Sequence, residues 1–128
     1  KLKKICKSMR ILIIEDAAES FGTKLKIRGK FMHSGCQADI GCFSFNGNKI
    51  ITTGSGGALV TNNKKFFNLA NHLASQAKED SFHYIHDQIG YNYKLNNLLS
   101  SLGLSQLKKL ESFIKKKKKN SSILCKNI

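Results

Sequence analysis

Lys49 lies where a lysine could react with a carbonyl group. It follows the turn sequence Asn46-Gly47-Asn48 and precedes the apolar pair Ile50-Ile51 and a glycine-rich turn at residues 54–57. Burial of an ammonium group costs free energy, so a desolvated lysine more readily becomes the neutral amine that forms a Schiff base. An exposed turn lysine with its charge in water is the alternative, and these residues taken alone favour it.

Asp16 is the second candidate, because it comes directly after an apolar run. A carboxylate at the end of a buried strand could keep a ring nitrogen protonated and so turn an aromatic ring into an electron sink. The sequence Asp16-Ala17-Ala18-Glu19 also suits the start of a helix, where aspartate accepts backbone N–H groups. Taken alone, Asp16 fits the helix cap better.

The remaining polar residues give weaker signals. The segment Gly54–Gly57 lacks the spacing of known phosphate-binding loops and is better explained as a turn that lets the backbone pass close to a neighbour. His83 and His86 are three residues apart but have no third ligand at a recognisable spacing, so no metal site is predicted. The four cysteines show no CxxC pattern and are expected to be reduced thiols.

Three short strands are needed to position these residues. The apolar run Arg10–Ile14 predicts a strand buried on both faces, with Asp16 at its carboxyl end, where open α/β sheets bind ligands. Asp39–Phe45 predicts a second strand and Ala58–Thr61 a third. Lys24–Gln37 is polar and predicts a loop or a ragged hairpin.

Helices are predicted mainly in the second half of the chain. Asn62-Asn63 could cap a helix running from about Lys64 to Ala77. Residues Glu79–Asn92 look irregular. Leucines recur at helical spacing from Leu95 to Ile114, which predicts a long amphipathic helix used in the core or in a subunit contact. Strands and helices together indicate an α/β fold with a mixed sheet flanked by helices.

The charge of the chain is concentrated at its two ends. The formal net charge is +14, but residues 11–107 hold nine basic and seven acidic side chains. The excess lies in residues 1–10 and in 108–128, which include the run Lys115–Lys119. Such a run is most often a solvated helix end, and nucleic acid is not expected as a partner. No apolar run is long enough to span a membrane or to form a signal-peptide core, so a cytoplasmic protein is expected.

Four segments, in order along residues 11–111, resemble the DegT/DnrJ/StrS family of sugar aminotransferases. The motifs are Glu15-Asp16-Ala17-Ala18-Glu19, the strand Asp39–Phe45 followed by Lys49, Thr52-Thr53-Gly54-Ser55-Gly56-Gly57, and Gly90-Tyr91-Asn92-Tyr93-Lys94-Leu95. The resemblance implies the large domain of a fold-type I aminotransferase, which acts as a homodimer and uses pyridoxal 5'-phosphate (PLP). Residues 1–128 would form part of that PLP-binding domain, with residues 112–128 as a basic tail.

The resemblance also implies roles for five residues. Lys49 would form the Schiff base with PLP and move the proton, and Asp16 would pair with the pyridinium nitrogen. Glu19, where many members have glutamine, would lie near the cofactor ring. Ser44 would bind the cofactor phosphate, and Asn92 would reach it from the neighbouring subunit.

The implied reaction transfers an amino group, with L-glutamate as the expected donor, to a nucleotide-linked keto-deoxysugar for surface polysaccharide. Two features count against activity of the isolated chain: family members are much longer, and Lys94 stands where they usually have arginine. We therefore expect a fragment that could be inactive alone. A basic, non-catalytic nucleic-acid-binding module and a decayed reading frame are the alternatives.

Overall fold

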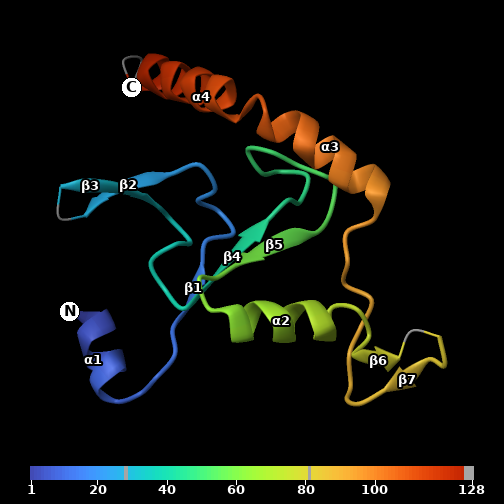
Figure 1. Cartoon of the computed structure of the whole chain (residues 1–128). Coiled ribbons are helices and arrows are strands. Elements are labelled where there is room, and N and C mark those ends of the chain that lie inside the picture. Colours follow the sequence, from blue (N-terminus) through green and yellow to red (C-terminus); the bar gives the residue numbers. More distant parts are fainter. Residues whose placement is uncertain (28, 81, 126–128) are drawn as a thin grey trace.

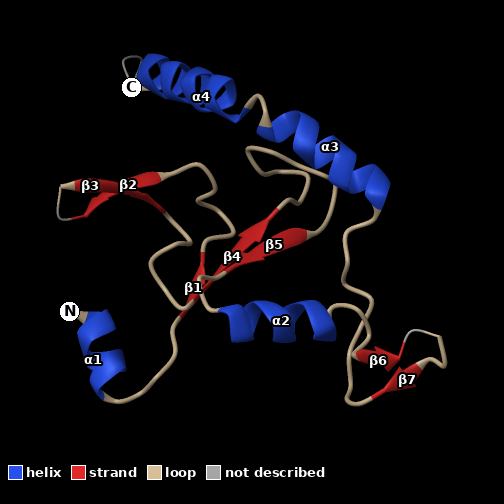
Figure 2. Ribbon diagram, in the orientation of Figure 1, coloured by secondary structure: helices blue, strands red, loops and turns tan. Residues whose placement is uncertain are grey.

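The computed structural model describes residues 1–27, 29–80 and 82–125. Arg28 in the predicted hairpin, Ser81 in the predicted irregular segment and Lys126 in the basic tail lie outside the described residues. Helices and strands are mixed along the chain, as expected for an α/β fold (Figures 1 and 2). The helix α1 (Leu2–Ser8), which was not predicted, precedes the first strand.

A three-stranded mixed sheet forms the centre of the fold. Its order is β1 (Ile14–Asp16), β4 (Ile40–Ser44) and β5 (Gly57–Val60). β1 runs parallel to β4, with Asp16 opposite Cys42, and β5 runs antiparallel to β4. The carboxyl ends of β1 and β4 therefore meet at one edge, and the chain segments that follow both strands begin there.

The first strand was predicted too early in the chain, and its burial on both faces is wrong. Arg10 has a positive φ of 57°, and the N–H of Ile11 donates to the carbonyl of Cys6, so this stretch is the connection from α1 rather than extended strand. Ile14, the first strand residue, is 66% exposed. β1 is an edge strand with β4 as its hydrogen-bonded neighbour. One apolar run in sequence thus became a turn followed by a short edge strand.

Two hairpins lie outside the central sheet. The predicted ragged hairpin is confirmed as β2 (Lys24–Ile27) paired antiparallel with β3 (Lys30–His33). The segment predicted as irregular contains a second, very short hairpin, β6 (Lys78–Asp80) with β7 (Ile85–His86). β6 and β7 pair irregularly, which explains why the sequence shows no alternating pattern there.

The helix α2 (Lys64–Leu73) begins where the sequence predicted but ends earlier. The Asn63 side chain accepts hydrogen bonds from the N–H groups of Lys65 and Phe66, which confirms the cap. The helix ends at Leu73 because the backbone turns shortly afterwards, and Gln76 and Ala77 both have positive φ values. α2 lies beside the sheet, on the other side from the two C-terminal helices (Figure 1).

The single long helix predicted from Leu95 is wrong, because two helices form instead. These are α3 (Asn97–Leu107), capped by the side chain of Asn96, and α4 (Leu110–Leu124). The leucine spacing did not mark this break, because Leu102 and Leu107 both lie in α3. A turn at residues 108–109 separates the two helices. Within the described ranges, no helix is both long and apolar enough to cross a bilayer.

Candidate active site at Lys49

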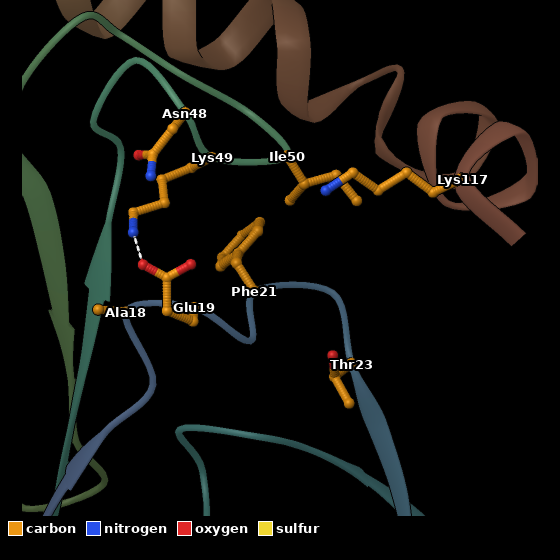
Figure 3. Close-up of a pocket in the computed structure, with 8 residues that line it drawn as sticks. All are labelled: Ala18, Glu19, Phe21, Thr23, Asn48, Lys49, Ile50 and Lys117. Atoms are coloured by element: carbon orange, nitrogen blue, oxygen red, sulfur yellow. Dashed lines mark hydrogen bonds and ion pairs between the residues drawn. The ribbon is translucent and has the colours of Figure 1, made fainter. Parts of the chain in front are cut away.

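Lys49 lies in the loop that joins β4 to β5, just beyond the carboxyl end of β4. Its backbone N–H donates to the carbonyl of Asn46 at 3.1 Å, which closes the predicted Asn-Gly-Asn turn. Its side chain points into a hollow and is only 10% exposed (Figure 3). The alternative of a fully solvated turn lysine is therefore wrong.

The hollow brings Lys49 and Glu19 together. The Lys49 ammonium donates to Oε1 of Glu19, whose own side chain is 78% exposed (Figure 3). Glu19 comes from the turn after β1 and Lys49 from the loop after β4, so the two parallel strands position the pair. The other residues lining the hollow are Ala18, Phe21, Thr23, Asn48, Ile50 and Lys117.

Lys117 is a residue that the sequence did not single out. It comes from α4 and lines the same hollow as Lys49 (Figure 3). Five consecutive lysines cover every face of a helix, so no periodicity in the run Lys115–Lys119 marks the one that turns inward. Because Glu19 is paired with Lys49, Lys117 leaves the hollow with one cationic side chain in excess, which suits an anionic group.

Asp16 is the last residue of β1, as expected, but it does not line the hollow. Its Oδ1 accepts a hydrogen bond from the N–H of Ala18 at 3.0 Å. The chain that follows forms a turn, closed by the Ser20 N–H on the Ala17 carbonyl at 3.0 Å, so the predicted helix cap is a turn cap. Asp16 shares its sheet edge with Lys49 without contacting the Lys49 side chain.

Ser44 and Asn92 lie in different parts of the fold. Ser44 is the last residue of β4, and its hydroxyl accepts from the N–H of Asn46 at 3.3 Å, at the base of the Lys49 loop. Asn92 is exposed and forms an isolated bridge with Ser75, beyond the end of α2. The structure thus places Asp16, Ser44, Glu19 and Lys49 around one edge of the sheet and leaves Asn92 outside the hollow.

Glu15 is a second residue that sequence reasoning missed. Its Oε1 accepts from the N–H of Gly35 at 2.7 Å, and its Oε2 accepts from the N–H of Gln37 at 2.9 Å. A half-buried carboxylate with two backbone donors is a strong local contact. Glu15 therefore fixes the chain that leads into β4, and its place directly after the apolar run Ile11–Ile14 was the available signal.

The glycine-rich turn confirms the prediction of a close backbone approach. Gly54 and Gly56 have φ values of 83° and 87°, a region that other residues rarely adopt. A Cβ atom on Gly57 would lie 2.3 Å from the carbonyl oxygen of Phe43. The turn can therefore return the chain directly alongside β4.

Two aspartates with shifted pKa values lie away from the hollow, in the β6–β7 region. A hydrogen bond from the His72 ring, at 2.6 Å, holds the pKa of the Asp87 carboxyl below its ordinary value. A hydrogen bond with His83, at 2.7 Å, lowers the pKa of Asp80 in the same way. These pairs stabilise the hairpin and its contact with α2.

Comparison with known proteins identifies relatives of the whole chain. The chain is 42% identical to a GDP-perosamine synthase of Escherichia coli O157:H7 over 128 residues, which is all of this chain and 34% of that enzyme. The chain spans about a third of the length of the curated relatives it matches, from 28% to 34%.

Solved structures show the same fold. Helicobacter pylori PseC, an aminotransferase involved in the biosynthesis of pseudoaminic acid, matches with a TM-score of 0.74 and 35% identity, over 85% of this chain and 29% of that chain. An E. coli GDP-4-keto-6-deoxy-D-mannose-3-dehydratase with bound hydrated PLP matches with a TM-score of 0.78 and 25% identity, over 94% of this chain and 34% of that chain. The predicted fold, part of a PLP-dependent aminotransferase large domain, is confirmed.

The family comparison covers every residue. The profile described as the DegT/DnrJ/EryC1/StrS aminotransferase family matches residues 1–128. The resemblance noted in four sequence motifs is thereby confirmed over the full length. This chain belongs to the DegT/DnrJ/EryC1/StrS aminotransferase family.

Proposed function

We propose that this chain carries the cofactor lysine of a PLP-dependent aminotransferase that acts on nucleotide-linked keto-deoxysugars in the cytoplasm. The observation that carries the proposal is the Lys49 side chain, which is 10% exposed although it belongs to a turn. An amine held largely out of water, at the carboxyl edge of a sheet, suits attack on a carbonyl.

The residues around this edge suit PLP by their chemistry. Lys49 supplies the amine, Asp16 a carboxylate for the ring nitrogen, and Ser44 a hydroxyl for the phosphate. When bound, PLP supplies an electron-withdrawing ring that stabilises negative charge on the carbon of the amino acid. These groups lie at or just beyond the carboxyl ends of β1 and β4. One pair of parallel strands would therefore position them together.

Glu19 would accept the proton that Lys49 must lose. An ammonium is not a nucleophile, so the Lys49 Nζ must lose a proton before it can attack a carbonyl. Oε1 of Glu19 accepts the hydrogen bond from this Nζ and is therefore the first group that could hold the proton. In later steps the neutral Lys49 amine would take up and return protons in the hollow.

A second subunit would complete the phosphate site. Asn92 bridges to Ser75 and is exposed, away from the hollow of its own chain. A role for Asn92 at the phosphate therefore needs the hollow of a neighbouring copy, which supports the proposal of a homodimer. Loss of PLP affinity on dilution below the dimer dissociation constant, measured by sedimentation and fluorescence, is the expected result.

The substrates are inferred from the relatives. GDP-perosamine synthase and the UDP-4-amino-4,6-dideoxy-N-acetyl-beta-L-altrosamine transaminase of Campylobacter jejuni carry nucleotide sugars in their names, and the latter is 36% identical over 124 residues. We propose a nucleotide-linked keto-deoxysugar as acceptor and L-glutamate as donor.

Lys94 stands in place of the usual arginine of the family. Its ammonium donates to the Asn71 side chain at 2.6 Å, which ties Lys94 to α2.

The cofactor test uses the purified chain with added PLP. We expect an absorbance band at roughly 410–430 nm, and borohydride should fix the cofactor covalently on Lys49. Lys49→Ala should abolish this attachment, while Lys65→Ala, which removes an exposed lysine of α2, should not. A spectrum of free PLP that is the same in the native chain and in Lys49→Ala would contradict the proposal for this chain.

A further inference from the structure

The loop that carries Lys49 is closed at its base by its own polar groups. The N–H of Thr53 and the hydroxyl of Thr52 both donate to the carbonyl of Phe45, each at 2.9 Å. The N–H of Gly54 donates to Oγ1 of Thr52 at 2.8 Å. Thr53 is 2% exposed and Ile51 is 3% exposed, so the half of the loop after Lys49 is anchored in the interior.

Helix α3 holds the same half of the loop from outside. The side-chain Oε1 of Gln106 accepts a hydrogen bond from the backbone N–H of Thr52 at 2.9 Å, across 54 residues of sequence. This N–H has no partner within the loop's own set of bonds named above. Gln106 therefore satisfies a part-buried donor whose exposure without a partner would cost free energy.

The close approach of α3 depends on a glycine one turn before Gln106. A Cβ atom on Gly103 would lie 2.9 Å from Cγ2 of Thr53, which is tighter than ordinary contact. Gly103 and Gln106 are three residues apart and so lie on the same face of α3. Two residues of this face thus contact Thr52 and Thr53, three and four residues after Lys49.

We propose that Gln106 is a positioning residue for Lys49. It fixes the backbone at Thr52 and thereby keeps the Lys49 side chain inside the hollow next to Glu19. Because an amide carries no titratable proton, this restraint stays constant while the charges of Lys49 and Glu19 change. The inference rests on the proposed function for its catalytic meaning, but the restraint itself can be measured without cofactor.

The test compares Gln106→Met with Gln106→Glu in the full chain. Methionine is similar in length but lacks a strong acceptor, whereas glutamate retains a carboxylate oxygen for the Thr52 N–H. Two quantities are measured at neutral pH without PLP: hydrogen exchange of the Thr52 amide, and acetylation of Lys49 by trace acetic anhydride relative to that of Lys65. Gln88→Met makes the same chemical change at an exposed site on another part of the fold.

We expect Gln106→Met to speed exchange at Thr52 by about five- to tenfold, the factor for one lost hydrogen bond, and to raise the Lys49/Lys65 acetylation ratio. Gln106→Glu should restore both values, and Gln88→Met should change neither. Gly103→Ala should act like Gln106→Met, because it pushes α3 away from Thr53. This second variant also tests the contact if Gln106→Met does not fold.

Three outcomes would overturn the inference. Thr52 exchange could remain unchanged in Gln106→Met, the acetylation ratio could remain unchanged while Thr52 exchange rises, or Gln106→Glu could fail to restore either value. A general loosening of the fold would also speed exchange at backbone amides far from the loop, such as that of Ala74 at the end of α2, and this exchange should stay unchanged in Gln106→Met. Failure of borohydride to fix PLP on Lys49 in the native chain would count against the proposed function alone, since the acetylation ratio needs no cofactor.

Discussion

The ammonium of Lys49 donates to Oε1 of Glu19 across thirty residues of sequence. The pair joins the turn after β1 to the loop after β4, the two segments that leave the sheet at the same edge. Most of Lys49 is out of contact with water, whereas most of Glu19 is exposed. The carboxylate therefore gives the Lys49 ammonium a charged partner in a hollow lined by both apolar and polar side chains.

Removal of the Glu19 charge should release Lys49 without unfolding the chain. In Glu19→Gln we expect Lys49 to be acetylated about two- to fivefold faster, the factor for a partly exposed ion pair. The free energy of unfolding should change by less than about 0.5 kcal/mol. Peptide mass mapping of acetylated chain gives the first quantity and urea denaturation the second.

The exposed pair of Lys24 and Glu111, at 3.3 Å, offers a matched control. Glu111→Gln should leave the acetylation of Lys49 unchanged. An equal increase at Lys49 in both variants would show that net charge, rather than the local contact, sets the reactivity of this amine.

Glu15 should matter for stability far more than its single charge suggests. Its carboxylate accepts two backbone N–H groups, from Gly35 and Gln37. Glu15→Ala leaves both part-buried donors without this partner and should cost about 2–3 kcal/mol of unfolding free energy. Glu15→Gln keeps one acceptor oxygen, so its free energy of unfolding should lie between those of the native chain and Glu15→Ala. Urea denaturation followed by circular dichroism measures the change.

Glu79→Ala, in the exposed middle of β6, is the comparison for this change. It removes the same atoms and the same charge, and we expect a change of less than about 0.5 kcal/mol. Equal midpoints for Glu15→Ala and Glu79→Ala would mean that the two backbone bonds contribute nothing measurable.

Gly41 and Gly47 should respond in opposite ways to the same substitution. A Cβ atom on Gly41 would lie 1.8 Å from the carbonyl oxygen of Gly35, so backbone would have to move to admit it. Gly41→Ala should destabilise by about 3 kcal/mol or prevent folding. Gly47 has nothing within 4 Å of its Cβ position, and Gly47→Ala should be nearly neutral. Thermal melting of the two variants tests this, and similar melting temperatures would refute it.

The sequence predicted where the candidate residues lie relative to the strands better than it predicted the contacts around them. Asp16 ends β1, Ser44 ends β4 and Lys49 follows β4, and the structure places these residues around one edge of the sheet although the first strand was predicted too early. The contacts of Gln106 and Glu15 were missed because each joins segments far apart in sequence, and nothing local marks a side chain that will reach a distant backbone N–H.

The errors in the fold have related causes. An apolar run such as Arg10–Ile14 can form a buried strand, an edge strand or the connection before a strand. Its hydrophobic pattern is the same in all three cases, so periodicity alone could not place β1. The break between α3 and α4 was not visible, because Leu107 and Leu110 on its two sides are three residues apart, which is ordinary helical spacing. Lys117 could not be distinguished from its neighbours because all five residues of the run are lysine.

Acid should weaken the link between the β6–β7 hairpin and α2. The hydrogen bond with His72 holds the pKa of Asp87 below its ordinary value of 3.8. A carboxyl whose pKa is lower in the folded chain stabilises the fold above about pH 3.8, and this stabilisation disappears as the pH falls through the folded pKa.

Below the folded pKa, neutral Asp87 no longer attracts His72, and the link between the hairpin and α2 weakens. We expect exchange of the Asp87 amide, which donates to the carbonyl of Ala77 at 3.3 Å, to accelerate beyond its intrinsic pH dependence as the pH falls below about 3.8. Asp87→Asn should remove this extra acid step, while Asp80→Asn, which affects the pair with His83 instead, should leave it in place. An acid step that survives in Asp87→Asn would assign it to another carboxyl group.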